Sequence, residues 1–141
     1  MRKFNFFFFS VLMGCVSLLA ACGAPQATGD QARQVVEQFY AALKAADYTG
    51  AAGHMDPNFF QREPQDVWIA SMKNVAAKLG PLQEMKLKES QINTIYSGRQ
   101  FLYIFINRYE KGNATETVVL LQPLDKKEIK VVAYKVESVL L

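Results

Sequence analysis

The stretch from Gln100 to Gln122, "QFLYIFINRYEKGNATETVVLLQ", decides the fold of this protein. Residues 100–110 are rich in aromatic and β-branched side chains and predict a long strand, and residues 115–122 predict a second one. Residues 111–113 between them contain the Gly and Asn of a tight turn. Because so short a connection joins antiparallel neighbours, the stretch predicts a β-hairpin.

Further strands are predicted on both sides of this hairpin. The segment "EMKLKES" at 84–90 alternates apolar and charged residues, and a turn at 97–99 follows it. After a turn at 123–127, the segment "EIKVVAYKVESVLL" at 128–141 predicts a closing strand. The second half of the chain is therefore predicted to be a four-stranded antiparallel meander.

The first half of the chain has the periodicity of helices. Val35, Phe39 and Leu43 recur at a spacing of four, which predicts a helix near 30–46 with Asp30 as its N-cap. A short helical turn is predicted from Thr49, its cap, to residue 55. Proline at 57 should end it, since the residue before a proline avoids the helical region.

A longer helix is predicted after Pro64, which suits a first-turn position. Its apolar face repeats at Trp68, 72, 75 and 79, and Gly80 followed by proline should end it. Helices followed by a run of strands predict an α+β fold, with the N-terminal helices packed on a curved four-stranded antiparallel sheet. One domain is expected, at 30–141.

The N-terminal 21 residues have the pattern of an export signal. Arg2 and Lys3 are followed by 18 mostly apolar residues, 4–21, which end in small side chains. On length alone, an uncleaved membrane anchor or an ordinary signal peptide would also fit. The small residues at the exit favour cleavage, so we expect 1–21 to be a signal peptide.

Leu19-Ala20-Ala21-Cys22 resembles the lipobox of bacterial lipoproteins. The resemblance implies that signal peptidase recognises Leu19, Ala20 and Ala21 and that the Cys22 sulfur carries a diacylglyceryl group. It also implies a fatty acid, such as palmitate, on the new amine. Residues 22–29 are then the lipidated cysteine and a flexible tether, and the domain lies outside the cytoplasm on a bacterial membrane. Gly23 in place of Asp favours the outer membrane, facing the periplasm, if the source is Gram-negative.

Composition excludes several classes of function. After residue 21 the chain has 14 basic and 13 acidic residues, so there is no basic excess for a nucleic acid. No cysteine follows Cys22, which excludes a disulfide within the domain and a cysteine metal site. His54 is the single histidine, and we read it as a surface or half-buried residue at a helix end. No cofactor is predicted.

The order of elements resembles the nuclear-transport-factor-2-like superfamily over about 30–141. The residues that carry the resemblance are "FYAAL" at 39–43, "AADYTGAAGHM" at 45–55, the Trp68 helix and the meander. Lys130-Val131 stands where many relatives have tryptophan. The resemblance implies a cone with an apolar pocket, in a superfamily that includes ketosteroid isomerases, scytalone dehydratases and many proteins that only bind ligands.

The residues expected to line such a pocket are aromatic or large and apolar. They are Phe39, Tyr40, Leu43, Trp68, Tyr103, Phe105 and Tyr134. An isomerase would need a carboxylate base and a hydroxyl. Asp47 and Asp56 are the nearest carboxylates, with hydroxyls from Tyr40, Tyr103, Tyr109 or Tyr134. We interpret both aspartates as cap or turn residues and predict no catalytic residue.

The predicted strand at 100–110 is apolar on both faces. Phe101, Tyr103 and Phe105 share one face, and Leu102 and Ile104 share the other. The second face needs a covering layer, a partner or a pocket. We therefore expect a membrane-anchored lipoprotein whose domain binds a small apolar ligand or another envelope protein. An isomerase or dehydratase and a structural homodimer are the alternatives.

Overall fold

Four antiparallel strands form one sheet in the computed structural model, which describes residues 27–141. The strands are β1 (Leu82–Ile95), β2 (Gly98–Tyr109), β3 (Asn113–Pro123) and β4 (Lys130–Glu137), and their order in the sheet is β1-β2-β3-β4. Each strand pairs with the next along the chain, so the sheet is the predicted meander. β4 is eight residues long, and residues 138–141 do not continue the predicted strand.

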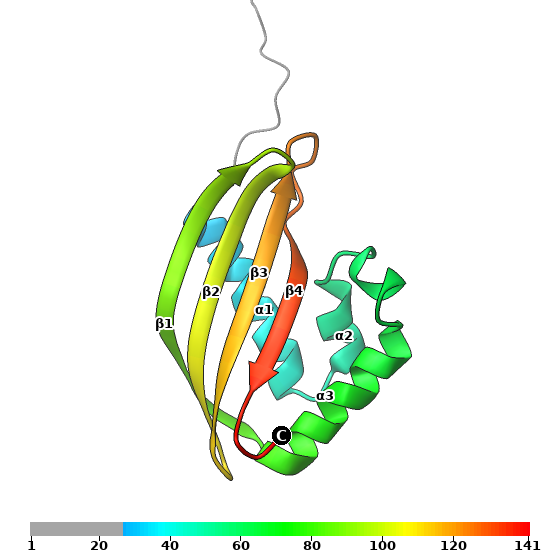
Figure 1. Cartoon of the computed structure of the whole chain (residues 1–141), viewed down its shortest axis with the longest axis vertical. Coiled ribbons are helices and arrows are strands. Elements are labelled where there is room, and N and C mark those ends of the chain that lie inside the picture. The colour runs from blue at the N-terminus through cyan, green and yellow to red at the C-terminus, as the bar shows by residue number, and fades with distance from the viewer. Residues whose placement is uncertain (1–26) are drawn as a thin grey trace, which may run out of the picture.

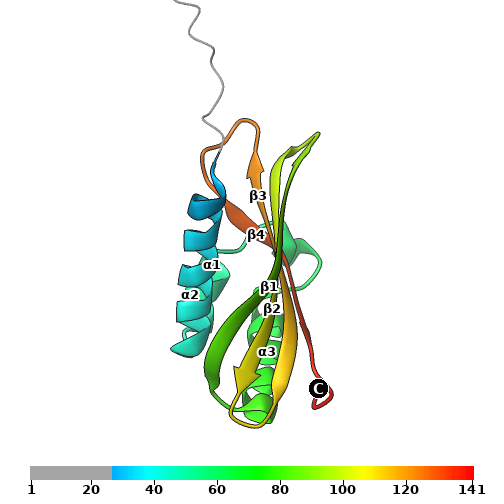
Figure 2. The same cartoon turned by 90° about the vertical axis from the view of Figure 1, so that its left-hand side faces the viewer.

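The helices precede the sheet, as predicted. They are α1 (Gly29–Lys44), α2 (Tyr48–Gly53), the short 3₁₀ turn η1 (Phe59–Gln61) and α3 (Gln65–Leu79). Figures 1 and 2 show α1 and α2 on one side of the sheet, with α3 toward its lower end. No helix of the described chain covers the opposite side of the sheet. The α+β prediction with helices packed on one face is confirmed.

The N-terminal cap of α1 differs from the prediction. Thr28, and not Asp30, is the N-cap: its hydroxyl accepts the N–H of Gln31, and the Gln31 side chain accepts the N–H of Thr28. This reciprocal pair satisfies two backbone donors, whereas Asp30 lies within the first turn, where its charge suits the helix dipole. The prediction of Thr49 as the cap of α2 is also wrong, because Asp47 accepts the N–H of Gly50.

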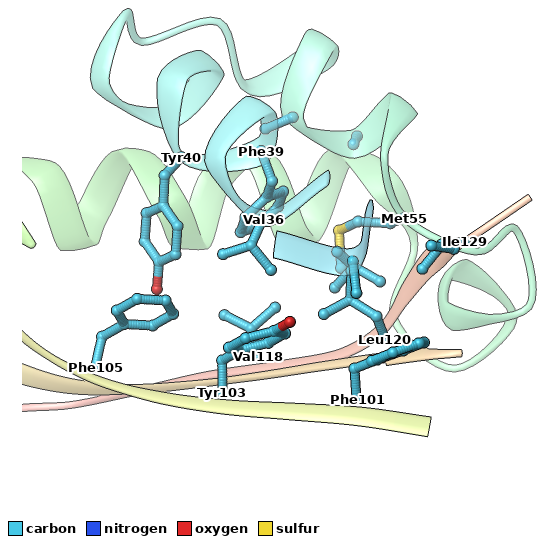
Figure 3. Packing of buried hydrophobic residues seen from close by; sticks show 14 of the residues in the cluster. Val36, Phe39, Tyr40, Met55, Phe101, Tyr103, Phe105, Val118, Leu120 and Ile129 are labelled. Carbon is cyan, nitrogen blue, oxygen red and sulfur yellow. The ribbon is translucent and has the colours of Figure 1, made fainter. Parts of the chain in front are cut away.

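The core lies between α1, α3 and the inner face of the sheet. Alternate residues of β2 and β3 point inward, so Phe101, Phe105, Val118 and Leu120 are buried. Figure 3 shows these side chains facing Val36 and other residues of α1. Trp68 and Leu79 add the buried positions of α3.

Among residues 27–141, no helix is both long and apolar enough to cross a bilayer. Cys22 and the recognition residues Leu19, Ala20 and Ala21 lie outside the described residues.

Candidate functional site

Glu116 is a carboxylate at the centre of the fold. Strand alternation places it on the inner face of β3, in line with Val118 and Leu120, and none of its surface is exposed. Carboxylates are almost never buried without partners, because the loss of hydration is costly. Glu116 therefore identifies a polar group inside an otherwise apolar core.

Three tyrosine hydroxyls donate hydrogen bonds to this carboxylate. Tyr40 of α1 and Tyr134 of β4 donate to Oε2, at 2.8 and 2.6 Å, and Tyr109 of β2 donates to Oε1 at 2.5 Å. Hydrogen bonds to an ionised acceptor are among the stronger ones in proteins. Four elements of the fold thus meet at one side chain. We call Glu116 and these three tyrosines the carboxylate cluster.

The carboxylate cluster keeps its phenols protonated. Burial raises the pKa of Tyr40 and of Tyr109 far above the ordinary value near 10, and the charge and hydrogen bond of Glu116 raise it further. The same two causes raise the pKa of the half-buried Tyr134. All three groups are therefore neutral donors at any physiological pH.

Asn107 lies next to the carboxylate cluster. Its amide is near enough to the Tyr40 hydroxyl to lower the pKa of that phenol, against the larger effects of burial and Glu116. Asn107 is fully buried, yet neither its amide nitrogen nor its amide oxygen makes a hydrogen bond of normal geometry. Buried polar atoms without a partner are rare and mark places where a fold gives up stability.

Aromatic rings fill the space around the carboxylate cluster. The Tyr40 ring contacts Phe105 edge to face at 5.3 Å between centroids, and Phe39 contacts Tyr134 in the same way at 5.1 Å. Trp68 lies 6.4 Å from Phe39. Figure 3 shows Tyr40 pointing from α1 toward Phe105 on the sheet. Glu116 is thus enclosed by side chains.

The predicted pocket-lining residues belong to this filled interior. Five are buried and the other two are partly buried and pack against them: Phe39, Tyr40, Trp68, Tyr103, Phe105, then Leu43 and Tyr134. Tyr103 stands apart from Glu116, because its hydroxyl donates to the Gly29 carbonyl at 3.0 Å.

A hollow of about 620 Å³ lies elsewhere, between α1 and residues 127–130, and none of the seven lines it. Its walls carry amides and charges, among them Gln34, Gln38 and Lys127. An apolar ligand is poorly matched to such a surface.

The other candidate residues have structural roles. Asp47 caps α2, and the carboxylate of Asp56 accepts the N–H of Asn58 at 2.8 Å, which confirms both as cap and turn residues. His54 is half-buried at the C-terminal end of α2, and burial and the nearby charge of Lys130 lower its pKa. No group of three His, Cys, Asp or Glu residues that could hold a metal ion occurs in the part of the chain that the structure describes.

The outer face of the sheet is the second feature that sequence analysis singled out. Leu102, Ile104, Val119 and Leu121 are half-buried there and Ile106 is 40% exposed. Because no described helix covers this face, their partial burial comes from neighbours on the same sheet. We call these five residues the apolar patch. Exposed patches of this kind mark interaction surfaces.

The sequence pattern around Glu116 predicts that its side chain is buried, although the sequence analysis considered only aspartates as catalytic carboxylates. In "TETVVLLQ" it occurs two residues before Val118 and four before Leu120, so a period of two places a charge on the apolar face. Asn107 interrupts the face of Phe105 and Tyr109 in the same way. A polar residue that shares the period of two with core residues along a strand therefore indicates a buried polar site.

Solved structures share this fold at low sequence identity. No family model matches the sequence, and no curated protein is similar to it. A proposed dehydratase of the nuclear-transport-factor-2-like family from Streptomyces avermitilis has a TM-score of 0.52 at 12% identity. The match covers 79% of this chain and 96% of that one. A protein from Catenulispora acidiphila has a TM-score of 0.53 at 13% identity, covering 77% and 88%.

A third neighbour is larger. Bd1075 of Bdellovibrio bacteriovorus has a TM-score of 0.54 at 14% identity, covering 76% of this chain and only 39% of its own. The described domain therefore shares the fold of these structures, one of which belongs to the nuclear-transport-factor-2-like family. At such identities the likeness concerns the fold alone.

High pH should destabilise this protein steeply. Tyrosines in the unfolded chain ionise near pH 10, whereas the three phenols of the carboxylate cluster stay protonated in the native state. Above about pH 10 the unfolded state then binds fewer protons, so the free energy of unfolding falls by about 1.4 kcal/mol per pH unit for each such tyrosine. Urea unfolding at about pH 8, 10 and 11 measures this slope.

Two phenylalanine variants control this prediction. Tyr40→Phe should make the slope shallower by about 1.4 kcal/mol per pH unit, because one linked proton is lost. Tyr96→Phe should leave it unchanged, since Tyr96 is fully exposed and makes none of the hydrogen bonds to Glu116. Equal slopes in the two variants would contradict the linkage.

Proposed function

We propose that this protein is a bacterial envelope lipoprotein whose domain binds a second protein molecule through the apolar patch. The lipobox Leu19-Ala20-Ala21-Cys22, with its charged and apolar leader, supports the anchor. Three observations support binding over catalysis: the interior is filled, the carboxylate is enclosed, and the outer face of the sheet is uncovered. Ligand binding and interaction are both common uses of this fold.

The observation that carries this proposal is the closed environment of Glu116. A general base must come within hydrogen-bond reach of the substrate atom from which it takes a proton. Here three phenols already occupy the carboxylate, and the rings of Phe39 and Phe105 fill the adjoining space. The cluster therefore serves to hold α1 on the sheet, and surface features remain for function.

A second copy of this chain is the partner that the outer face fits best. Strand register places residues of opposite charge at the two ends of one row across this face: Glu89, Ile104, Thr117 and Lys135. A neighbouring row reverses the signs: Lys86, Ile106, Thr115 and Glu137. Each row thus has an isoleucine and a threonine inside and charges at its rim, as in a protein interface with a polar rim.

A twofold axis parallel to the strands makes these rims complementary. It sets the β1 edge of one copy against the β4 edge of the other, so Glu89 faces the second copy's Lys135 and Lys86 faces its Glu137. Within one chain, Lys135 already pairs with Glu137 at 2.7 Å in an exposed contact. Exposed pairs of this kind contribute little, so an exchange between copies costs little.

A second candidate function, an isomerase or dehydratase, is favoured by the carboxylate and phenols of the cluster and by the neighbour from Streptomyces avermitilis. In this case α1 must move away from the sheet to admit a substrate. This function predicts that Glu116→Gln lowers turnover of an enolisable ketone or a hydroxy compound by about 100-fold or more, with the fold retained. Turnover that is equal in both proteins, or absent from both, contradicts it.

Replacing Cys22 by serine should remove the lipid anchor. The intact mass of the mature wild-type protein should equal a chain that begins at Cys22 plus its acyl groups, and Cys22→Ser should lack the acyl mass. Cys15→Ser is the matched control and should keep the lipid, because Cys15 is removed with the leader. A Cys22→Ser variant that keeps the same acyl mass, or a wild-type protein that has none, would refute the lipoprotein assignment.

A charge placed in the apolar patch should dissociate the proposed dimer. Ile104→Lys puts an ammonium where the second copy would bury it, which should weaken dimerisation at least about tenfold. Val67→Lys is the control, because Val67 is 49% exposed on α3, away from this face. Light scattering on the mature protein over a concentration series reports its mass.

Charge exchange tests the geometry of the same interface. Glu89→Lys should weaken the dimer a few-fold by setting like charges together, and Glu89→Lys with Lys135→Glu should restore it. A wild-type protein that stays monomeric up to millimolar concentration would refute the second copy as partner. Restoration that fails would refute the proposed twofold axis.

A further inference from the structure

The end of the domain where the described chain begins combines two exposed loops. These are the β1–β2 turn with the last residue of β1, at 95–97, and the first part of the β3–β4 loop, at 124–127, and Figures 1 and 2 show both at the upper end of the sheet. Strand register brings them together, because Gly98 pairs with Ile95 on one side and with Pro123 on the other. We call residues 95–97 and 124–127 the tether end.

The tether end exposes large apolar side chains, whereas solvated turns usually carry small or polar ones. Tyr96 is fully exposed, Leu124 is 60% exposed and Ile95 is 38% exposed. Lys126 and Lys127 are exposed beside Leu124. An aromatic ring with a hydroxyl, aliphatic side chains and flexible ammonium groups are together typical of a surface at a lipid headgroup layer.

The chain enters the domain at this same end. The Ala27 N–H donates to Oε1 of Gln122 at 2.6 Å, and the Ala27 carbonyl accepts from the Arg99 guanidinium at 2.9 Å. Gln122 and Arg99 pair with each other in the register of β3 and β2, one row from Gly98 and Pro123. Both bonds fix Ala27 beside the tether end.

These bonds leave a short connection to the lipidated cysteine. Four residues lie between Cys22 and Ala27, so five steps along the chain, at about 3.4 Å each, span about 17 Å at most. If Cys22 is held at the bilayer surface by its acyl chains, the tether end lies within that distance of the headgroups. A headgroup layer is itself several ångströms deep, so contact needs only a modest bend of the tether.

We propose that the tether end lies against the lipid surface, with Tyr96 and Leu124 in the headgroup layer. This inference rests on the proposed anchoring through Cys22. Lys126 and Lys127 then face lipid phosphates, and Asp125 is the acidic residue between Leu124 and them. Glu128 is engaged by Lys130 at 3.0 Å and contributes little charge of its own. The second contact orients the domain, because attachment at Cys22 alone does not fix its orientation.

The chain provides a clean way to measure this contact. No cysteine follows Cys22, and Cys22 is acylated in the mature protein, so an introduced thiol is the one reactive site. Ser97→Cys places a fluorophore next to Tyr96 without removing it. Val139→Cys is the matched control, since Val139 is fully exposed and lies two residues before the C-terminus, which Figure 1 shows toward the opposite end of the sheet. Both labelled lipoproteins are reconstituted in vesicles of phosphatidylethanolamine and phosphatidylglycerol.

Lipids with a nitroxide on the headgroup then report distance from the membrane. We expect at least twofold stronger quenching at position 97 than at 139, and we expect Tyr96→Ser with Leu124→Ser to abolish the difference. Equal quenching at both positions, with the protein floating with the vesicles, overturns the contact and leaves the anchor intact. A protein that does not float with vesicles and lacks acyl mass overturns both proposals. A difference that survives the double serine variant overturns the role of these two side chains.

Discussion

The hydrogen bonds of Glu116 hold this fold together. The carboxylate comes from β3, and its three donors come from α1, β2 and β4, so one side chain joins the helix layer to three strands. A buried carboxylate that lost a donor would be left poorly solvated in an apolar core, which is strongly destabilising. The cost of separating α1 from the sheet is therefore electrostatic as well as hydrophobic.

The interior of the domain is filled by side chains, so its surface is the more suitable place for binding. Phe39, Phe105 and Trp68 are buried and pack around the carboxylate cluster. In an open cone, the same rings would line a ligand site. The uncovered sheet face, in contrast, has aliphatic residues where a solvated antiparallel sheet would have polar ones. The same alternation that buries Phe101 and Phe105 brings Leu102 and Ile104 to that outer face.

Periodicity predicted the elements because burial of one face is a local pattern. The spacing of Val35 and Phe39 identified α1, and the hairpin at 100–122 identified the centre of the sheet. The sites were less predictable, since they depend on residues far apart in the chain. Tyr40 and Glu116 are 76 positions apart, and nothing local shows that they meet. Periodicity did not predict the cap of α1, because Thr28 lies in the segment expected to be the tether.

The proposed anchoring through Cys22 and the proposed dimer interface are geometrically consistent with each other. The strands run from the tether end to the opposite end of the domain (Figure 1), so contact of the tether end with a bilayer sets them along the membrane normal. The apolar patch then faces sideways, toward other proteins on the same membrane. Two anchored copies that meet there share a twofold axis along the normal, which is parallel to the strands. That is the axis under which Glu89 faces Lys135, and confinement to a membrane raises the effective concentration of such partners.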